Sequence, residues 1–366
     1  MFENTFKVFH YTYAGRPLTV EVGKLAGQAN GSCLVRYGDT CILACATASA
    51  APREGIDFLP LSVDYNEKMY AVGKIPGGYL KREGKPSEKA VLTSRVIDRP
   101  VRPLFPKDLR NDVALALEVM SVDTDCSPEI TAMIAASIAL SISDIPWNGP
   151  IGGAFVGLVD GEIVINPTAA QRELSTLELT VAASEQKVVM IEAGAKEVSD
   201  EDMFAAIMKA HEVIKELLVF INSIVAEVGK PKFSYPSGDL DHDMFDEIFA
   251  YCEKAVMEAL DTDDKNVRDA RMQPILEDIK ATFIEKYPSL DVQLAEVIYK
   301  VQKKIVRRWL IEEKKRVDVR RMDQIRPLAA EVGILPRTHG TGLFSRGQTQ
   351  VLTIATLGPI SDAQRL

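Results

Sequence analysis

The residues with the clearest chemical potential are a run of cations between Lys74 and Arg110. This stretch holds ten basic residues and only four acidic ones, an excess of six in a chain whose formal net charge is −9. The basic residues are Lys74, Lys81, Arg82, Lys85, Lys89, Arg95, Arg99, Arg102, Lys107 and Arg110. A local excess of positive charge on an acidic protein attracts anionic ligands without coating the whole surface with cations. We therefore expect an anion-binding site in this stretch.

Three arginines in this stretch are candidates for phosphate contact. Arg95, Arg99 and Arg102 are spaced four and three residues apart, so on a helical turn they would share one face. Guanidinium groups bind phosphate oxygens in a bidentate geometry. Pro100 and Pro103 argue against a long regular helix and favour a short helix end or a tight loop. The alternative is that the arginines form structural ion pairs with nearby carboxylates, namely Asp98, Glu83 and Glu88.

A second candidate lies just before the arginines. Tyr79 stands beside Lys81 and Arg82 and follows Gly77-Gly78, a pair that makes the backbone flexible. An aromatic ring next to two cations suits single-stranded nucleic acid, because bases stack on the ring while phosphates meet the cations. For Tyr79, a nucleic-acid contact and an ordinary exposed position are equally open.

The elements that must position these residues alternate between short β-rich runs and helices. Examples of the β-rich runs are 18–22, 33–37, 41–47, 114–122 and 187–193, and Gly38-Asp39 is a hairpin signal between two of them. One helix is predicted over 130–142. Another begins near Ser199, with Asp202 as its capping partner, and stops at Gly229. Residues 1–229 are therefore predicted to form an α/β (α+β) domain with mixed sheets and packed helices.

A linker and a helical region follow this domain. Residues 230–240 are rich in Pro, Gly and Ser, which predicts a linker. Residues 241–316 are charged and helix-periodic, with breaks near Asp261–Lys265 and at Tyr287-Pro288, and predict a small all-α domain of two or three helices. The basic stretch Lys300–Arg316 could contact RNA, but two glutamates interrupt it, which favours a solvated helix face.

The end of the chain repeats its beginning. Residues 331–358 resemble residues 21–47: Glu, Val, Gly and Leu match in register, Arg346 matches Arg36, and Gly347-x-Thr349 matches Gly38-x-Thr40 after a one-residue gap. Glycines and threonines shared across both segments are hard to explain by β-composition alone. Residues 317–366 are therefore predicted to open a second copy of the first domain, which stops at Leu366 with its sheet barely begun.

Bulk properties narrow the class of protein. The chain has 366 residues, of which 46% are hydrophobic and 26% charged, an ordinary globular composition. No apolar run approaches the roughly 20 residues that span a bilayer, and the N-terminus lacks the pattern of a secretory signal. The five cysteines form no C-x-x-C pair, which predicts reduced, buried thiols. We expect a cytoplasmic protein with no membrane partner.

Two α/β cores joined by a helical domain resemble the polynucleotide phosphorylase family, which has two ribonuclease PH-like cores. Segments 57–88, 94–106 and 144–157 look like the first core and 335–358 like the opening of the second, so the resemblance covers the entire chain. It implies processive 3′-to-5′ phosphorolysis of single-stranded RNA to nucleoside diphosphates, reversible as polymerisation. It also implies a homotrimeric ring, inorganic phosphate as co-substrate, Mg²⁺, KH and S1 modules after the second core, and contacts with RNA-degradation machinery.

The same resemblance assigns roles to the candidate residues. In the family, the segment at Tyr79-Leu80-Lys81-Arg82 is a loop at the constriction of the ring, where it grips RNA, and it often reads Phe-Phe-Arg-Arg. This chain keeps one ring and two charges. The RNA- or phosphate-binding set is thus Tyr79, Lys81, Arg82, Arg95, Arg99 and Arg102. The opening of the second core adds Arg337, His339 and Arg346, of which His339 is either a ligand contact or, as we favour, a satisfied core histidine.

The resemblance places the catalytic chemistry outside the first core. In the family's second core, a Ser-rich loop before a helix holds phosphate, and closely spaced aspartates with a lysine hold the metal. At the matching places this first core has Asp125-Cys126-Ser127-Pro128-Glu129 and, within 175–184, only Glu178. A carboxylate at a helix N-terminus repels phosphate, and one carboxylate is a poor magnesium site. We expect no metal site in this chain, and catalytic residues beyond Leu366.

Two other functions and one departure from the family pattern stay open. The chain could be a non-catalytic RNA-binding or scaffold module. It could also be an unrelated enzyme for a small anionic substrate, which the internal repeat disfavours. The departure is Asp318-Val319-Arg320, where the family usually has glycine in the middle. If the backbone needs a positive φ there, Val319 is strained.

Overall fold

A computed structural model describes residues 6–53 and 55–362 of the chain. It divides after Gly238 into two compact units. Among the described residues, no helix has both the length and the apolar character needed to cross a membrane. All five cysteines are free thiols, and four of them are buried as predicted, whereas Cys45 is partly exposed.

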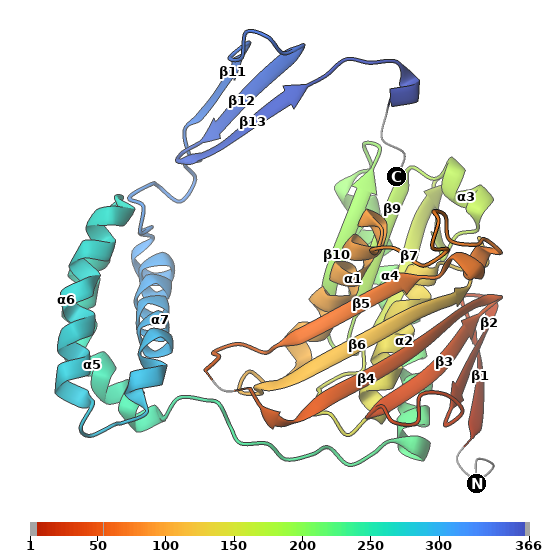
Figure 1. Ribbon diagram of the computed structural model, residues 1–366, viewed down its shortest axis with the longest axis horizontal. Helices are drawn as coiled ribbons and strands as arrows, with labels where there is room; N and C mark the ends of the chain where they lie inside the picture. Colours follow the sequence, from red (N-terminus) through yellow and green to blue (C-terminus); the bar gives the residue numbers. More distant parts are fainter. Residues whose placement is uncertain (1–5, 54, 363–366) are drawn as a thin grey trace. The chain divides into compact units, whose positions relative to one another are not determined.

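The first unit contains a six-stranded sheet (Figure 1). Its strands run antiparallel except for the parallel pair β5 and β6. Gly38 adopts φ +55°, and Tyr37 pairs with Thr40, which confirms the predicted two-residue hairpin turn. In spatial order the strands are β1 (Lys7–Tyr13), β2 (Arg16–Val22), β3 (Gly31–Tyr37), β4 (Thr40–Pro52), β6 (Asn111–Ser121) and β5 (Leu61–Glu67).

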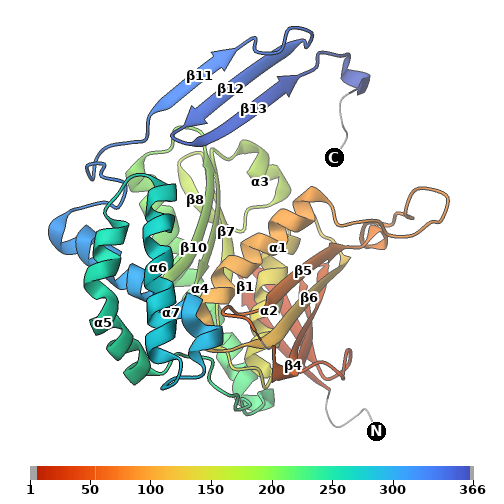
Figure 2. The same ribbon diagram turned by 60° about the vertical axis from the view of Figure 1, so that its left-hand side comes forward.

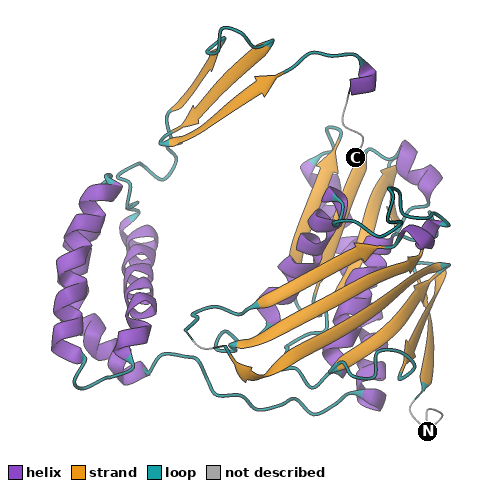
Figure 3. Cartoon of the chain, in the orientation of Figure 1, coloured by secondary structure: helices purple, strands orange, loops and turns teal. Residues whose placement is uncertain are grey.

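A second, four-stranded antiparallel sheet belongs to the same unit. Its order is β10 (Val188–Ala195), β9 (Leu177–Ala183), β7 (Gly152–Val159) and β8 (Glu162–Ile165). The helix α2 (Pro128–Ile142) packs against strands of both sheets and is buried along almost its whole length (Figure 3). A helix that is apolar on every face requires such a double covering. The predicted helix over 130–142 is therefore the centre of the first core.

Two longer helices complete this unit, beside the short α3 (Ala169–Leu174). The helix α4 (Asp200–Val228) begins where predicted, with the Ser199 hydroxyl accepting from the backbone N–H of Asp202. The helix α1 (Glu88–Val101) is longer than the predicted short helix end or tight loop. Pro100 lies in its last turn, so the prolines mark where the helix ends and a 3₁₀ turn (η2, Arg102–Leu104) begins, and leave the earlier turns intact.

Most of the predicted linker, 230–240, belongs to the first unit, which extends to Gly238. The ammonium of Lys232 donates to the carbonyls of Leu140, Ser141 and Ser143 at the C-terminal end of α2. The hydroxyl of Tyr235 donates to Asp108 at 2.9 Å. The chain therefore leaves the first unit only after Gly238.

Three helices open the second unit, with breaks where the sequence predicted them. They are α5 (His242–Leu260), α6 (Lys265–Phe283) and α7 (Leu290–Arg308), followed by a π-helical turn, η3 (Trp309–Glu313). Asp241 and Asp264 cap the first two by accepting from backbone N–H groups. The apolar faces enclose a core that includes Met244, Val301 and Trp309.

The last three strands repeat the pattern of β2, β3 and β4. The strands β11 (Leu328–Val332), β12 (Gly340–Arg346) and β13 (Thr349–Ala355) form an antiparallel meander. Gly333 and Gly347 adopt positive φ, as do their counterparts Gly23 and Gly38. Arg346 pairs with Thr349 as Tyr37 pairs with Thr40, so Arg346 corresponds to Tyr37 and the predicted match with Arg36 is wrong by one residue.

Val319 precedes this sheet with φ +51°. A β-branched residue in the left-handed region is a genuine outlier, because its Cβ substituents crowd the backbone. The strain predicted for the position where the resembled family has glycine is thus present, at a typical cost of about 1–3 kcal/mol.

Candidate functional site

A cavity of about 850 Å³ opens on the first unit, beside the basic stretch. Its walls come from the segment 66–72, the loop 76–87, the segment 119–124, the first turns of α1 and α2, and α3. Both cations and carboxylates line it, namely Lys68, Arg82, Lys85, Lys89, Arg172, Glu67, Glu83, Asp123 and Glu129. Burial and charge together make this cavity the candidate site of the first core.

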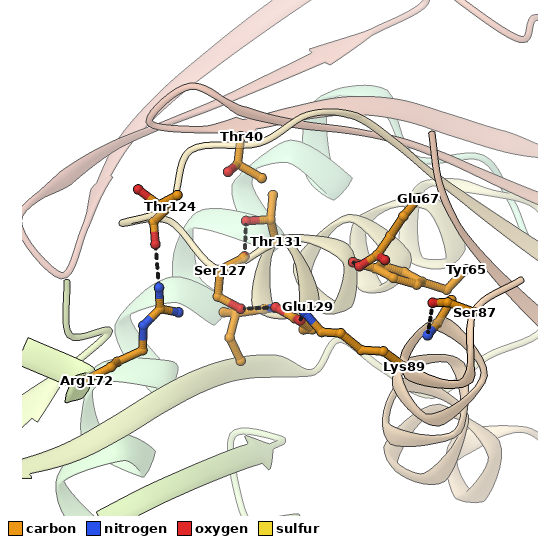
Figure 4. Close-up of polar contacts among 12 residues, drawn as sticks. Thr40, Tyr65, Glu67, Ser87, Lys89, Thr124, Ser127, Glu129, Thr131 and Arg172 are labelled. Atoms are coloured by element: carbon orange, nitrogen blue, oxygen red, sulfur yellow. Dashed lines mark hydrogen bonds and ion pairs between the residues drawn. The ribbon is translucent and has the colours of Figure 1, made fainter. Parts of the chain in front are cut away.

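The N-terminus of α2 is occupied by one of its own carboxylates (Figure 4). The Ser127 hydroxyl caps the helix by accepting from the backbone N–H of Ile130, and it donates to Glu129 at 2.6 Å. The ammonium of Lys89, in the first turn of α1, lies 2.7 Å from the other oxygen of Glu129. Glu129 therefore places negative charge at the end of the helix where backbone N–H groups would otherwise attract an anion.

The electrostatics of this pair favour the charged forms of both partners. Burial raises the pKa of Glu129, but the hydrogen bonds from Lys89 and Ser127 lower it by more, so the pKa lies below its ordinary value. Burial lowers the pKa of Lys89, but the bond and charge of Glu129 raise it above its ordinary value. The pair joins α1 to α2 across 40 residues of sequence and fixes one wall of the cavity.

We expect Glu129→Gln to lower the free energy of unfolding of the first unit by about 1 kcal/mol at pH 7, a modest value because solvent screens a half-exposed pair. The pKa of Glu129 is lower in the folded than in the unfolded state. The stabilisation is therefore complete above the unfolded pKa of about 4.3 and is lost as the pH falls through the folded pKa. Urea unfolding of both proteins across this pH range measures the difference.

Lys89→Met is the control for this prediction. It removes the same pair from the other side, so its penalty and that of Glu129→Gln should not add in the double variant. A penalty of Glu129→Gln that keeps its full size in strong acid would contradict the electrostatic explanation and point to lost packing.

The loop before α1 presents Tyr79 fully to solvent. The side chain of Tyr79 is 98% exposed, Leu80 beside it is also exposed, and Gly78 and Lys81 both adopt positive φ. Figure 2 shows this loop standing out from the body of the first unit. Arg82 lines the cavity, so the loop joins the site to solvent. The structure thus brings the predicted Tyr79, Lys81 and Arg82 together on one projecting segment.

The three predicted arginines lie on α1 and the turn that follows it, and they differ in their partners. Arg102 donates to both oxygens of Asp98, at 2.9 and 2.7 Å. Arg99 pairs with Glu192 of β10, a partner that the sequence did not suggest. Within the described part of the chain, Arg95 is exposed and has no ion pair. Ion pairing therefore engages two of the three, while Arg95 is available to a ligand.

The place where the resembled family's paired aspartates would lie is the strand β9 and its edges. Glu178 is exposed there, opposite Gly194 of β10. Across residues 6–53 and 55–362, no group of three or more His, Cys, Asp or Glu side chains could hold a metal ion. These residues do not fit a magnesium site.

The candidates in the second unit are exposed. Arg337 and His339 lie in the turn before β12, and Arg346 ends that strand. The Nδ1 atom of His339 accepts from the backbone N–H of Leu357 at 2.8 Å. His339 is therefore a hydrogen-bonded residue that the described sheet leaves exposed, and its assignment as a core histidine stays a prediction.

Sequence reasoning missed several charged residues of the cavity, among them Arg172 and Lys89. Arg172, on α3, donates to the carbonyl of Thr124 (Figure 4). Lys89 appeared only as one of ten cations, although it follows Ser87, whose hydroxyl caps α1. Serine is a typical residue at the start of a helix, so Ser87 was the local signal that could have placed Lys89 in the first turn of α1. Nothing local identifies Arg172.

Three family profiles match the chain. Residues 14–146 match the 3′ exoribonuclease family, domain 1, and residues 149–213 match domain 2 of the same family. Residues 243–321 match the polyribonucleotide nucleotidyltransferase RNA binding domain. The first two profiles confirm the predicted fold class of the first unit.

Curated relatives match nearly the whole chain. The polyribonucleotide nucleotidyltransferase of Ruminiclostridium cellulolyticum is 59% identical over 361 residues, which cover 99% of this chain and 51% of that protein. The protein of the same name from Lachnoclostridium phytofermentans is 55% identical over 99% of this chain and 52% of its own length. The chain thus spans about half the length of the curated relatives it matches.

Proposed function

Because this chain belongs to the polyribonucleotide nucleotidyltransferase family, we propose that it takes part in processive 3′-to-5′ phosphorolysis of single-stranded RNA. The products are nucleoside diphosphates, and the reaction is reversible as polymerisation. Inorganic phosphate is the co-substrate. The protein acts as a cytoplasmic homotrimer that holds RNA at the loop around Tyr79, and its partners include RNA-degradation machinery.

Within that reaction, the first core, residues 1–229, binds RNA and supports the trimer without performing chemistry. The observation that supports this role is the ion pair between Glu129 and Lys89 at the N-terminus of α2. A phosphate at this helix end would meet a carboxylate that already holds the nearby cation and hydroxyl, so like charges would repel. Tyr79, Lys81 and Arg82, which have no such pairing with any residue that the structure describes, supply the RNA contacts.

The phosphate and Mg²⁺ sites belong to the half of the relatives that this chain does not span. Mg²⁺ prefers several oxygen ligands in octahedral geometry, which a lone Glu178 does not provide. The helical domain, 241–316, follows the segment 230–240, and residues 317–366 open the second core. Arg337, His339 and Arg346 then lie near the entrance to the catalytic half.

A non-catalytic RNA-binding or scaffold module is the second candidate function, and the Glu129–Lys89 pair favours it for these residues taken alone. A small-substrate enzyme would use the 850 Å³ cavity as its pocket. The dependence of RNA binding on oligomer length separates the RNA-binding module from the small-substrate enzyme, because a small-substrate enzyme gains nothing from a longer oligomer.

The test is phosphorolysis of a labelled oligoadenylate by this 366-residue chain with phosphate and Mg²⁺, with RNA binding followed in parallel. We expect binding that strengthens with oligomer length and no release of ADP. Phosphate-dependent release of ADP would overturn the assignment of the chemistry to the other half. Absence of any RNA binding would overturn the proposed role of the first core.

A further inference from the structure

The basic stretch of α7 separates into two rows of side chains. Residues four apart on a helix lie above one another. Lys300, Lys304 and Arg308 form one row, and Tyr299, Lys303 and Arg307 form the next. The sequence alone favoured a solvated face for the whole stretch, but the structure gives the two rows different surroundings.

The first row is held by α5 and by the start of the second unit. Lys300 pairs with Asp239 and Glu296, and Arg308 lies 2.6 Å from Glu253. Lys304 has no ion pair among the described residues, but its ammonium lies 4.0 Å from the ring centroid of Phe249. Two of these three cations are therefore neutralised by carboxylates.

The second row has no such partners. Tyr299 is 61% exposed, and Lys303 and Arg307 are exposed without an ion pair to any described residue. The ammonium of Lys303 lies 5.8 Å from the ring centroid of Tyr299. The row continues as Ala295 and Ile311, so it carries no carboxylate over four turns.

We propose that Tyr299, Lys303, Arg307 and the neighbouring Lys304 form a binding strip for single-stranded RNA, which we call the α7 strip. This rests on the proposed function and extends it from the first core to the helical domain. Successive members of the row are four residues, and so about 6 Å, apart along the helix axis. That spacing lets an extended strand place one phosphate at each cation while a base stacks on Tyr299.

RNA fits this surface better than an acidic protein does. An acidic partner would use the cations alone, whereas the exposed ring beside Lys303 adds a stacking platform that bases use and carboxylates do not. The profile that matches residues 243–321 is that of an RNA binding domain, and the α7 strip lies within it.

The test compares three variants of the whole chain by fluorescence anisotropy with a labelled oligoadenylate. Lys303→Gln with Arg307→Gln should raise Kd about tenfold at low salt and reduce the slope of log K against log salt by roughly 1.4, because two phosphate contacts are lost. Tyr299→Ala should raise Kd about fivefold with the slope unchanged, because stacking releases no counterions.

Lys254→Gln with Lys265→Gln is the matched control, since it removes two exposed cations from α5 and α6 and should change Kd less than twofold. If the Lys303→Gln/Arg307→Gln variant and the control variant have equal Kd values, the α7 strip is refuted and the proposed function is unaffected. If polyglutamate displaces the RNA and Tyr299→Ala has no effect, the surface suits an acidic protein and the proposal is wrong. If the unchanged chain binds no RNA, both proposals fall.

Discussion

Replacing Lys81 and Arg82 together by glutamine should weaken the binding of single-stranded RNA at least tenfold at low salt. Both cations lie on the projecting loop with no carboxylate partner among the described residues. Their charge is therefore available to phosphate, and loss of two contacts should reduce the salt slope by roughly 1.4. Tyr79→Ala in the same loop should weaken binding further, since stacking contributes about 1–3 kcal/mol per base. Anisotropy titrations at several salt concentrations measure both effects.

Lys107→Gln with Lys187→Gln gives the matched control. Both lysines are exposed on the first unit, and replacing them changes the net charge by the same amount as replacing Lys81 and Arg82. If this control weakens binding as much as the loop variant does, the attraction comes from the overall field of the protein and the loop has no special role. The folded state should be unaffected by either pair, because none of the four side chains is buried.

Local signals in the sequence predicted several elements of the fold. Gly38-Asp39 predicted the β3–β4 hairpin because a two-residue turn needs positive φ, and Gly38 adopts it. The apolar run 130–142 predicted α2, and the repeat at 331–358 predicted a second meander. In each case the residues that specify the element lie within it or in its turn.

The candidate site was less predictable because its contacts are not local. Arg99 pairs with Glu192, 93 residues away, and Lys89 pairs with Glu129. Sequence showed that these residues could bind anions, but not that carboxylates from other elements already engage them. The prolines after Asp98 predict that no long helix forms there. A proline in the last turn removes only one hydrogen bond, however, so α1 forms with Pro100 near its end.

The position of α2, on which the cavity depends, is set by a residue with no side chain. Gly31 begins β3 where the strand passes close to the end of α2. A Cβ added there would lie 2.2 Å from the carbonyl oxygen of Ala139 and 2.7 Å from the Cβ of Ser143. The first of these is a backbone atom in the buried part of α2, so no flexible side chain can move aside.

Gly31→Ala should therefore lower the free energy of unfolding of the first unit by about 3 kcal/mol, at the upper end of overpacking penalties. Since 1 kcal/mol shifts Tm by about 2–4 °C in a domain of this size, Tm should fall by about 6–12 °C in a thermal melt. Gly27→Ala is the matched control, because nothing lies within 4 Å of its added Cβ and its φ is not positive. It should be neutral or slightly stabilising.

Gly31→Ala also tests whether the core positions the site. If α2 shifts to make room, Glu129 moves relative to Lys89, and the penalty of Glu129→Gln should shrink in the Gly31→Ala background. An unchanged penalty with a lowered Tm would mean that β3 yields and α2 keeps its place. Equal stability of Gly31→Ala and Gly27→Ala would refute the close approach itself. In that case the Glu129–Lys89 pair and the Ser127 cap hold the cavity wall in place, and close packing of β3 against α2 does not.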